Sequence, residues 1–259
     1  MVDSNQYLTS LSQKLIFDPI KKDKVELSIA RLTKNLWGHF QDRLASVEVI
    51  GSFDRETIIS EDKNSDVDII VVFKQKEVKP DTYLNQLKAF CKTVYPSSEI
   101  YQDYPTIVID MEHVKFEIVP SFFVTDSVKK IPAPRAKEFS WINTSPKEFK
   151  NSVDAKDRNN KNLIKPLIRI FKYWNFLNDK AFSSYEIEKL LISKSYTSIS
   201  LKDYFISGIN VLTENANTDA QKKVCAALRE HRRRLRILEE NKIPEYVEPE
   251  LQAFIPLPK

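Results

Sequence analysis

The spacing of hydrophobic positions changes along the chain and predicts an α/β first part followed by a helical second part. Through residues 21–44, apolar side chains recur every three or four residues, the period of one buried face on a long helix. The members of this stripe are Val25, Ile29, Leu32, Leu36 and Phe40. We expect this helix to be a spine of the fold, because its stripe offers a long surface for packing.

Four strands and a second helix are predicted after the spine helix. The stretch "SVEVI" (46–50) alternates as a half-buried strand does, and "VDIIVVF" (67–73) is almost continuously apolar, as in a central strand covered on both faces. A helix at 80–94 has a proline at its start and another just beyond its end. Two more strand patterns, "PTIVIDM" (105–111) and "HVKFEIVPSFFV" (113–124), are joined by a turn. Together they predict a mixed or mostly antiparallel sheet.

The second part of the chain has a helical pattern. From about residue 146 to residue 240, apolar positions follow the helical period almost throughout. The last stretch, 243–259, is rich in proline, and we expect it to be extended or loosely packed. The pattern therefore indicates an α+β fold of two domains. We place a lobe with a mixed sheet and a long N-terminal spine helix at 1–145, and a helical lobe at 146–259.

Composition narrows the class of protein. The chain has 259 residues, 42% of them hydrophobic, and can bury a substantial core. No apolar run reaches the roughly 18 residues of a membrane span, and the N-terminal stretch does not resemble a signal peptide, so we expect a cytoplasmic protein. Cys91 and Cys225 lie far apart without CxxC spacing, which predicts buried thiols instead of a disulfide or zinc site. A net charge of +4 selects no class of partner.

Carboxylates interrupt two of the predicted strands. Side chains alternate between the faces of a strand, so Asp66 and Asp68 share one face of theirs. Two neighbouring carboxylates repel each other in a low-dielectric setting unless a cation lies between them. Such oxygen ligands suit Mg²⁺ or Mn²⁺. Glu117, inside another apolar strand, is the candidate third ligand, and the alternative is that it pairs with Lys115 on an edge strand.

A glycine directly follows the first predicted strand in a chain that holds only three glycines. At this position Gly51 would let a ligand approach the backbone closely. Ser52 is a natural N-cap for a short helix in "FDRETI", whose free N–H groups would face an anion. The two residues predict a phosphate-binding turn, and we expect Arg55 either to line it or to pair with Asp54 or Glu56.

These residues form one motif: Gly51-Ser52, a spacer of 13 residues, the Asp66–Asp68 pair and the later Glu117. The motif resembles that of the DNA polymerase beta-like nucleotidyltransferase superfamily. Three stretches, "GSFDRETI", "IRIFKYWN" and "FSSYEIEKLL", are similar to the branch that holds cyclic GMP-AMP synthase, oligoadenylate synthase and the bacterial CD-NTases of antiphage signalling. The resemblance spans roughly residues 45–195.

The resemblance implies a catalytic centre and a nucleotide site. Asp66, Asp68 and Glu117 would be catalytic and would coordinate two Mg²⁺ or Mn²⁺ ions, while Gly51, Ser52 and Arg55 would contact the nucleotide. In the helical lobe, Lys172 would supply charge to the triphosphate, Ser184 a hydrogen bond and Tyr185 a stacking platform for a base. Without the resemblance, these three residues read equally well as an exposed helix lysine, an N-cap and a core aromatic.

The activity implied is the conversion of ribonucleoside triphosphates (ATP, GTP, CTP or UTP) into a cyclic or short linear second messenger with release of pyrophosphate. The resemblance further implies a monomer in bacterial antiphage signalling (CBASS), with no membrane and no required DNA activator, and with an effector protein encoded separately. One alternative keeps the chemistry but transfers nucleotides to an RNA end, a protein or a small molecule. A second alternative is a nucleotide-binding scaffold on a decayed transferase fold.

Two further features are read as structural. His39, His113 and His231 are isolated and lack metal-ligand spacing. The run Arg232–Arg236 looks basic enough for a nucleic-acid patch, but on a helix the leucines around it form a buried stripe and the arginines fan outward. We therefore expect a solvated helix face there.

Overall fold

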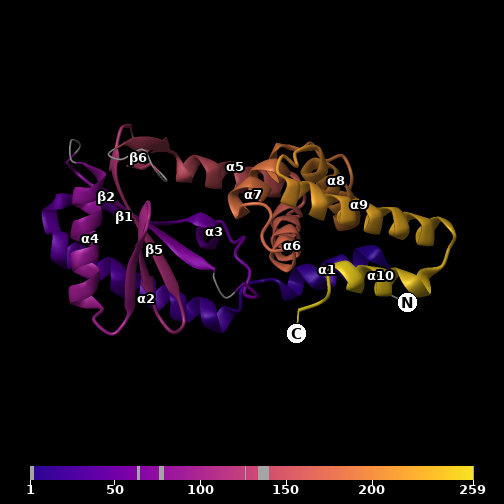
Figure 1. Ribbon diagram of the computed structural model, residues 1–259, viewed down its shortest axis with the longest axis horizontal. Helices are drawn as coiled ribbons and strands as arrows, with labels where there is room; N and C mark the ends of the chain where they lie inside the picture. Colours follow the sequence, from indigo (N-terminus) through magenta and orange to yellow (C-terminus); the bar gives the residue numbers. More distant parts are fainter. Residues whose placement is uncertain (1–2, 63–64, 76–78, 126, 134–139, 259) are drawn as a thin grey trace. The chain divides into compact units, whose positions relative to one another are not determined.

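The computed structural model describes residues 3–62, 65–75, 79–125, 127–133 and 140–258 (Figure 1). The chain divides into two compact units. The sheet unit comprises Phe17–Glu56 and Asn64–Asn151, and the helical unit comprises Met1–Ile16, Thr57–Lys63 and Ser152–Lys259. These units differ from the lobes expected from the sequence, 1–145 and 146–259. One reason is that α1 (Ser4–Lys14) packs with the C-terminal helices and so belongs to the helical unit.

Within the described residues, seven strands form one mixed sheet. Its main order is β1 (Leu44–Ile50), β2 (Asp66–Phe73), β5 (Lys115–Phe123), β4 (Thr106–Asp110) and β3 (Glu99–Asp103). At the far end of β5, β6 (Lys129–Pro132) pairs with it, and β7 (Trp141–Thr144) pairs with β6. β2 and β5 run parallel, whereas the other pairs are antiparallel. The prediction of a mixed sheet with an internal strand at 67–73 is confirmed.

Two long helices, α2 (Pro19–Phe40) and α4 (Pro80–Val94), pack on one face of this sheet (Figure 1). Each begins with a proline, which has no N–H to leave unsatisfied in the first turn. The buried stripe of α2 is the predicted one, and it joins a core made with alternate residues of β2: Val67, Ile69, Val71 and Phe73. Asp66 and Asp68 therefore face away from these helices.

Three further helical elements, η1 (Gln41–Arg43), α3 (Gly51–Asp54) and α5 (Pro146–Asn159), begin in the sheet unit. η1 ends the spine helix earlier than predicted, and α5 leads into the helical unit. The predicted short helix after the first strand is present, but its bounds and its N-cap are wrong: α3 spans Gly51–Asp54, with Ile50 at the N-cap position. Ser52 is thus inside the helix instead of capping it, because the chain turns one residue earlier, at Gly51, where φ is +77°.

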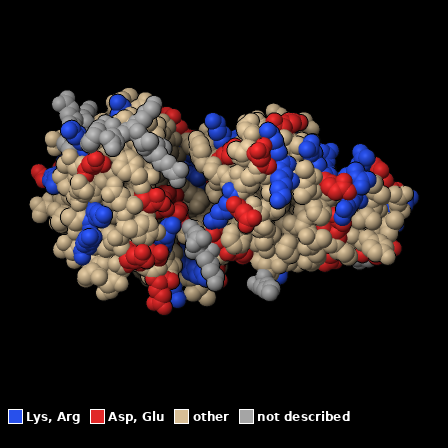
Figure 2. All heavy atoms as spheres, in the orientation of Figure 1, with Lys and Arg blue, Asp and Glu red and all other residues tan. Residues whose placement is uncertain are grey.

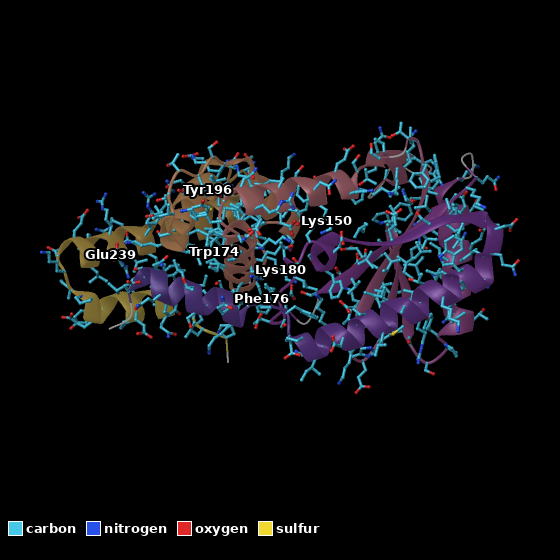
Figure 3. The ribbon with its side chains drawn as sticks, turned by 180° about the vertical axis from the view of Figure 1, so that it is seen from behind. Lys150, Trp174, Phe176, Lys180, Tyr196 and Glu239 are labelled. Atoms are coloured by element: carbon cyan, nitrogen blue, oxygen red, sulfur yellow. The ribbon has the colours of Figure 1, made fainter. Side chains whose placement is uncertain are left out.

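The helical unit is built around α6 (Ile164–Leu177), which is buried on most sides. α1 (Ser4–Lys14), α7 (Ser184–Ser193) and α8 (Leu201–Glu214) contact it, and α9 (Asp219–Glu240) packs on α8. Phe171 of α6 stacks on Phe205 of α8 with ring centroids 5.0 Å apart. Trp174, only 2% exposed, lies one turn further along α6 in the same core (Figure 3). The helical pattern predicted from residue 146 onward is confirmed.

The prediction of an extended or loosely packed C-terminal end is wrong. After η2 (Pro244–Tyr246) the chain forms α10 (Val247–Phe254), which packs on α1 and α9 and is followed by the fully buried C-cap residue Ile255. The Tyr7 hydroxyl of α1 donates a hydrogen bond of 2.8 Å to the carbonyl of Ile255. Proline is compatible with this helix because Pro249 lies in its first turn, where no intrahelical N–H bond is required.

The features read as structural behave so in the fold. His113 hydrogen bonds Ser28 at 2.8 Å, and His231 pairs with Glu250 of α10. Arg233 and Arg234 both bind Glu230 on the outside of α9, and on the face drawn in Figure 2 acidic and basic side chains are interspersed. Arg232 is the exception to the predicted solvated face, since it is partly buried and donates a hydrogen bond to Asn210 of α8. Both cysteines are buried free thiols. Among the described residues, no helix combines the length and apolar character needed to cross a bilayer.

Candidate active site

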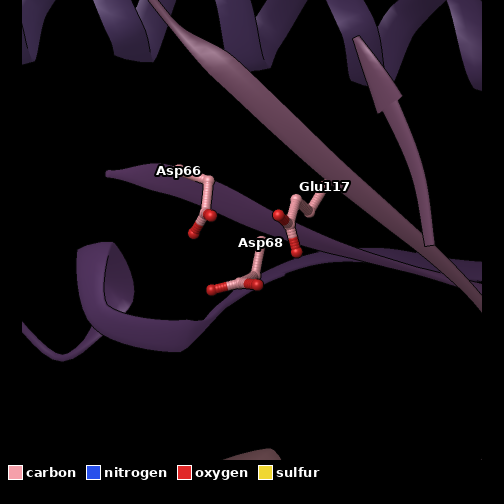
Figure 4. Close-up of side chains that lie close together, drawn as sticks. All are labelled: Asp66, Asp68 and Glu117. Carbon is pink, nitrogen blue, oxygen red and sulfur yellow. The ribbon is translucent and has the colours of Figure 1, made fainter. Parts of the chain in front are cut away.

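Three carboxylates converge on the face of the sheet opposite α2 and α4 (Figure 4). In the parallel pairing of β2 with β5, Asp68 lies directly beside Glu117, and Asp66 lies on the same face two residues earlier. One carboxylate oxygen from each residue lies within 4.8 Å of the others. All three side chains are partly exposed, so a ligand has access to them.

The surrounding apolar residues fix this arrangement. Val67 and Ile69 on β2, and Phe116 and Ile118 on β5, are 2% exposed or less, and each flanks a carboxylate in sequence. These neighbours are buried against the helices, so the acidic side chains must point to the opposite face of the sheet. A shift of the strand register by one residue would expose the core. The short-range alternation of the sequence therefore determines which way the carboxylates point.

The neighbouring negative charges shift the pKa of Glu117. Burial, together with the charges of Asp66 and Asp68, raises the pKa of Glu117 to about 8. A glutamic acid with this pKa binds its proton near neutral pH when no cation is present. The donor set, three hard carboxylate oxygens under mutual repulsion, therefore fits a divalent cation such as Mg²⁺ or Mn²⁺.

Gly51 is required by the position of Asp68. A Cβ atom placed on Gly51 would lie 1.7 Å from Oδ2 of Asp68 and 2.6 Å from its Cγ. The backbone φ of +77° is also one that other residues rarely adopt. The glycine therefore leaves space for a carboxylate of the triad, a role that its position after a strand did not reveal.

Ser52 and Arg55 lie in and just after α3, close in sequence to the triad's glycine. Ser52 is the second residue of α3 and is partly exposed. Arg55 is 8% exposed, and its guanidinium lies 5.1 Å from the ring centre of Phe149 at the start of α5. Their contact with a nucleotide stays a prediction.

Lys172 belongs to a buried polar cluster in the helical unit. Its ammonium nitrogen lies 2.5 Å from Oε1 of Glu188 and 3.2 Å from the hydroxyl of Thr57, which itself donates to the same carboxylate oxygen at 2.7 Å. Glu188 is fully buried and Lys172 is 5% exposed. The alternative of an exposed helix lysine is therefore wrong, while the role of Lys172 toward a triphosphate stays a prediction.

Ser184 and Tyr185 are the first two residues of α7. The N-cap is Ser183, whose hydroxyl accepts the N–H of Glu186 at 3.1 Å, so the alternative that made Ser184 the cap is wrong. Tyr185 is 55% exposed, which also excludes the alternative of a core aromatic. Both side chains belong to the helical unit, and their contact with a nucleotide stays a prediction.

In the sequence analysis, Lys115 appears only as an alternative partner of Glu117, in place of a metal ion. The structure shows the contact but not the edge strand, since β5 pairs with β2 on one side and β4 on the other. The Lys115 ammonium lies 3.8 Å from Asp66 and 3.6 Å from Glu117. Burial lowers the pKa of Lys115, but the two carboxylates outweigh it, so the pKa is raised overall. The spacing of Lys115 and Glu117, two residues apart on one strand, was the available signal.

Fold and site together define a nucleotidyltransferase, with an aspartate pair on one strand and a third acid on its parallel neighbour. CdnG of Bradyrhizobium diazoefficiens, a CD-NTase solved in complex with GTP, has a similar fold, with a TM-score of 0.76, 12% identity, and coverage of 97% of this chain and 95% of that one. The CdnC:HORMA-deltaN complex of E. coli MS115-1 gives a TM-score of 0.67 at 18% identity, covering 83% of this chain and 73% of that one.

The family is shown by the sequence itself. The Second Messenger Oligonucleotide or Dinucleotide Synthetase domain (SMODS) matches residues 2–159, and the chain belongs to this family. A curated relative, the CCA-adding enzyme of Picrophilus torridus, is 26% identical over 181 residues, which is 68% of this chain. The chain spans only 40% of the length of that relative.

Proposed function

We propose that Asp66, Asp68 and Glu117 hold two divalent cations, Mg²⁺ or Mn²⁺, and that the chain joins ribonucleoside triphosphates into a cyclic or short linear second messenger. The convergence of the three carboxylates within 4.8 Å is the observation that carries this proposal. Membership of the synthetase family supports the class of product. When bound, the ions would activate the attacking ribose hydroxyl and stabilise charge on the leaving pyrophosphate.

The reaction exchanges one bond for another at a single phosphorus atom. A ribose oxygen of one nucleotide forms a bond to the α-phosphorus of another, and the bond from that phosphorus to the bridging oxygen breaks. Pyrophosphate leaves with the electron pair, and the proton of the hydroxyl passes to water. Asp66, Asp68 and Glu117 would hold the cations that offset the negative charge of the reactants, and Gly51 leaves Asp68 room to take part.

Further residues are proposed to contact the nucleotide. Ser52 and Arg55 would contact the triphosphate near the triad, and Lys172, held by the buried Glu188, would supply positive charge. Ser184 would add a hydrogen bond. The exposure of Tyr185 supports its role as a stacking platform. In functional terms, residues 1–145 would be the catalytic lobe and 146–259 the nucleotide-binding lobe.

The solved relatives support nucleoside triphosphates as substrates. CdnC was solved with ATP and in complex with HORMA-deltaN, and CdnG was solved with GTP. By analogy, this chain would take ATP, GTP or the pyrimidine triphosphates, act in bacterial antiphage signalling (CBASS) without a DNA activator, and pass its product to a separately encoded effector. It would act as a monomer in the cytoplasm.

A second candidate function is nucleotide addition to an RNA end. The likeness to a CCA-adding enzyme over 181 residues favours it, and the triad would serve that reaction equally well. The two candidates differ in the acceptor, which is a second nucleotide in one case and an RNA 3′ end in the other.

The test is an incubation of the purified chain with Mg²⁺ or Mn²⁺ and the four labelled ribonucleoside triphosphates, without any acceptor. Pyrophosphate release together with phosphatase-resistant products supports the first proposal. Products formed only after addition of an RNA with a free 3′ end support the second. If the chain binds triphosphates but forms no product with any acceptor, both proposals are overturned.

The matched variants isolate the triad. Asp66→Asn with Asp68→Asn should abolish turnover, because both side chains lose the charge that holds a cation. Asp42→Asn with Asp103→Asn removes the same charge from two exposed positions and should leave turnover unchanged. Continued product formation by the first double variant would contradict the assignment.

A further inference from the structure

A lysine lies inside the acidic site, on the strand that carries the third acid. Lys115 is the first residue of β5 and pairs directly with Asp66 across the parallel ladder. Glu117 follows two residues later, so both side chains project from the same face of the sheet. The register of two strands therefore gathers three carboxylates and one ammonium in one place.

The contacts of Lys115 are close but not tight. Its nitrogen lies 3.8 Å from Oδ2 of Asp66 and 3.6 Å from Oε1 of Glu117, beyond the usual reach of a hydrogen bond of about 2.7–3.2 Å. The three side chains are 22% to 29% exposed, so water screens the attraction only in part. The ammonium thus lies between these two carboxyl groups without being locked to either.

A divalent cation would seek these same carboxylate oxygens. Two positive groups repel each other in a confined site, so the ammonium and the cation cannot both gain the full attraction of Asp66 and Glu117. The four-carbon stem of lysine is flexible enough to carry its charge away toward solvent. Binding of the cation at this side of the triad therefore has to displace or weaken the contacts of Lys115.

We propose that Lys115 is a built-in counter-ion of the triad: it keeps Asp66 and Glu117 together in the metal-free chain and competes with the divalent cation for them. This inference rests on the proposed function, because it assumes that the triad binds such a cation. Lys115 is a positioning residue in this account. It acts on the reaction through the occupancy of the site and sets how much free cation the enzyme requires.

The test compares Lys115→Met with the wild-type chain in two measurements that need no turnover. The first is the affinity for Mn²⁺, followed by electron paramagnetic resonance of the free ion. Lys115→Met should bind Mn²⁺ more tightly, on the order of tenfold, which is the effect of losing a partly screened competing charge. Lys92→Met removes one exposed lysine from α4 and should match the wild type.

The second measurement is thermal unfolding with a chelator and with saturating Mn²⁺. Without metal, Lys115→Met should unfold at a lower temperature than the wild type, because Asp66 loses its ion-pair partner. With Mn²⁺ this deficit should disappear, since the cation replaces the lysine. A lysine that is merely structural would give the same deficit in both conditions.

The outcomes separate this inference from the proposed function. If the wild type binds no Mn²⁺ and the Asp66→Asn, Asp68→Asn variant behaves alike, the proposed function fails. If the wild type binds Mn²⁺ but Lys115→Met binds it equally or more weakly, the triad stands and the role of Lys115 is overturned.

Discussion

Addition of one methyl group at Gly51 tests the geometry of the site most sharply. In Gly51→Ala the new Cβ would lie 1.7 Å from Oδ2 of Asp68, whereas ordinary contact begins at 3.4 Å. The carboxylate must therefore retreat by about 1.7 Å, or the turn must deform. In addition, alanine at a φ of +77° costs about 1–2 kcal/mol of stability.

The retreat of Asp68 should affect activity far more than folding. A misplacement of about 1 Å in a catalytic group can lower the rate on the order of 100-fold, so we expect at least this loss in pyrophosphate release by Gly51→Ala. Mn²⁺ binding should weaken in parallel, because one ligand has moved. Urea unfolding should show only the modest loss of stability due to the backbone.

The two other glycines provide matched controls. Among the described residues, apart from its chain neighbours and the backbone of its own helix, nothing lies within 4 Å of a Cβ built on Gly38 in α2, so Gly38→Ala should stabilise the chain slightly and leave Mn²⁺ affinity unchanged. Gly208→Ala places a Cβ 2.4 Å from the Phe171 ring and should destabilise by about 1–3 kcal/mol without affecting Mn²⁺ affinity. Wild-type turnover and Mn²⁺ affinity in Gly51→Ala would refute the reasoning.

Two further predictions concern the charged groups. Because the pKa of Glu117 is raised from 4.5 to about 8 in the folded chain, the folded state binds more protons than the unfolded state between these values, and the metal-free chain should lose stability as pH rises from about 4.5 to about 8. Urea midpoints at pH 5 and pH 8 should show a larger fall for the wild type than for Glu117→Gln, and equal falls would contradict the shift. Glu188→Ala should lower the free energy of unfolding by about 3–5 kcal/mol, since it leaves the Lys172 charge buried without its partner. Urea unfolding measures this loss, and a change no larger than that of the exposed Glu240→Ala would count against the buried pair.

Local patterns were sufficient to predict the elements that build the site. The period of α2 and the apolar run of β2 are strong signals, and alternation along β2 and β5 determines the face of each acid. Convergence of Asp68 and Glu117 further needs β2 and β5 to be neighbours. The place of Glu117 in an apolar strand made it the candidate third ligand, but no local pattern shows that its strand lies beside β2.

The parts that sequence reasoning missed depend on long-range packing. The prolines in and around α10 concealed its helical pattern, and its burial requires partners on α1 and α9. The clash that requires Gly51 and the position of Lys115 beside Asp66 arise only when strands are paired in register. Glu188 lies in an ordinary amphipathic helix pattern that does not mark it as buried. Its ion pair with Lys172 forms only when α6 and α7 pack together.

The most direct test of the central claim is a crystal structure of the chain with Mn²⁺ and a non-hydrolysable ribonucleoside triphosphate, analysed for anomalous scattering. Our account predicts two manganese peaks bound by Asp66, Asp68 and Glu117, with triphosphate oxygens completing their coordination. Manganese bound elsewhere, or a triphosphate in place with no manganese at these three carboxylates, would contradict it.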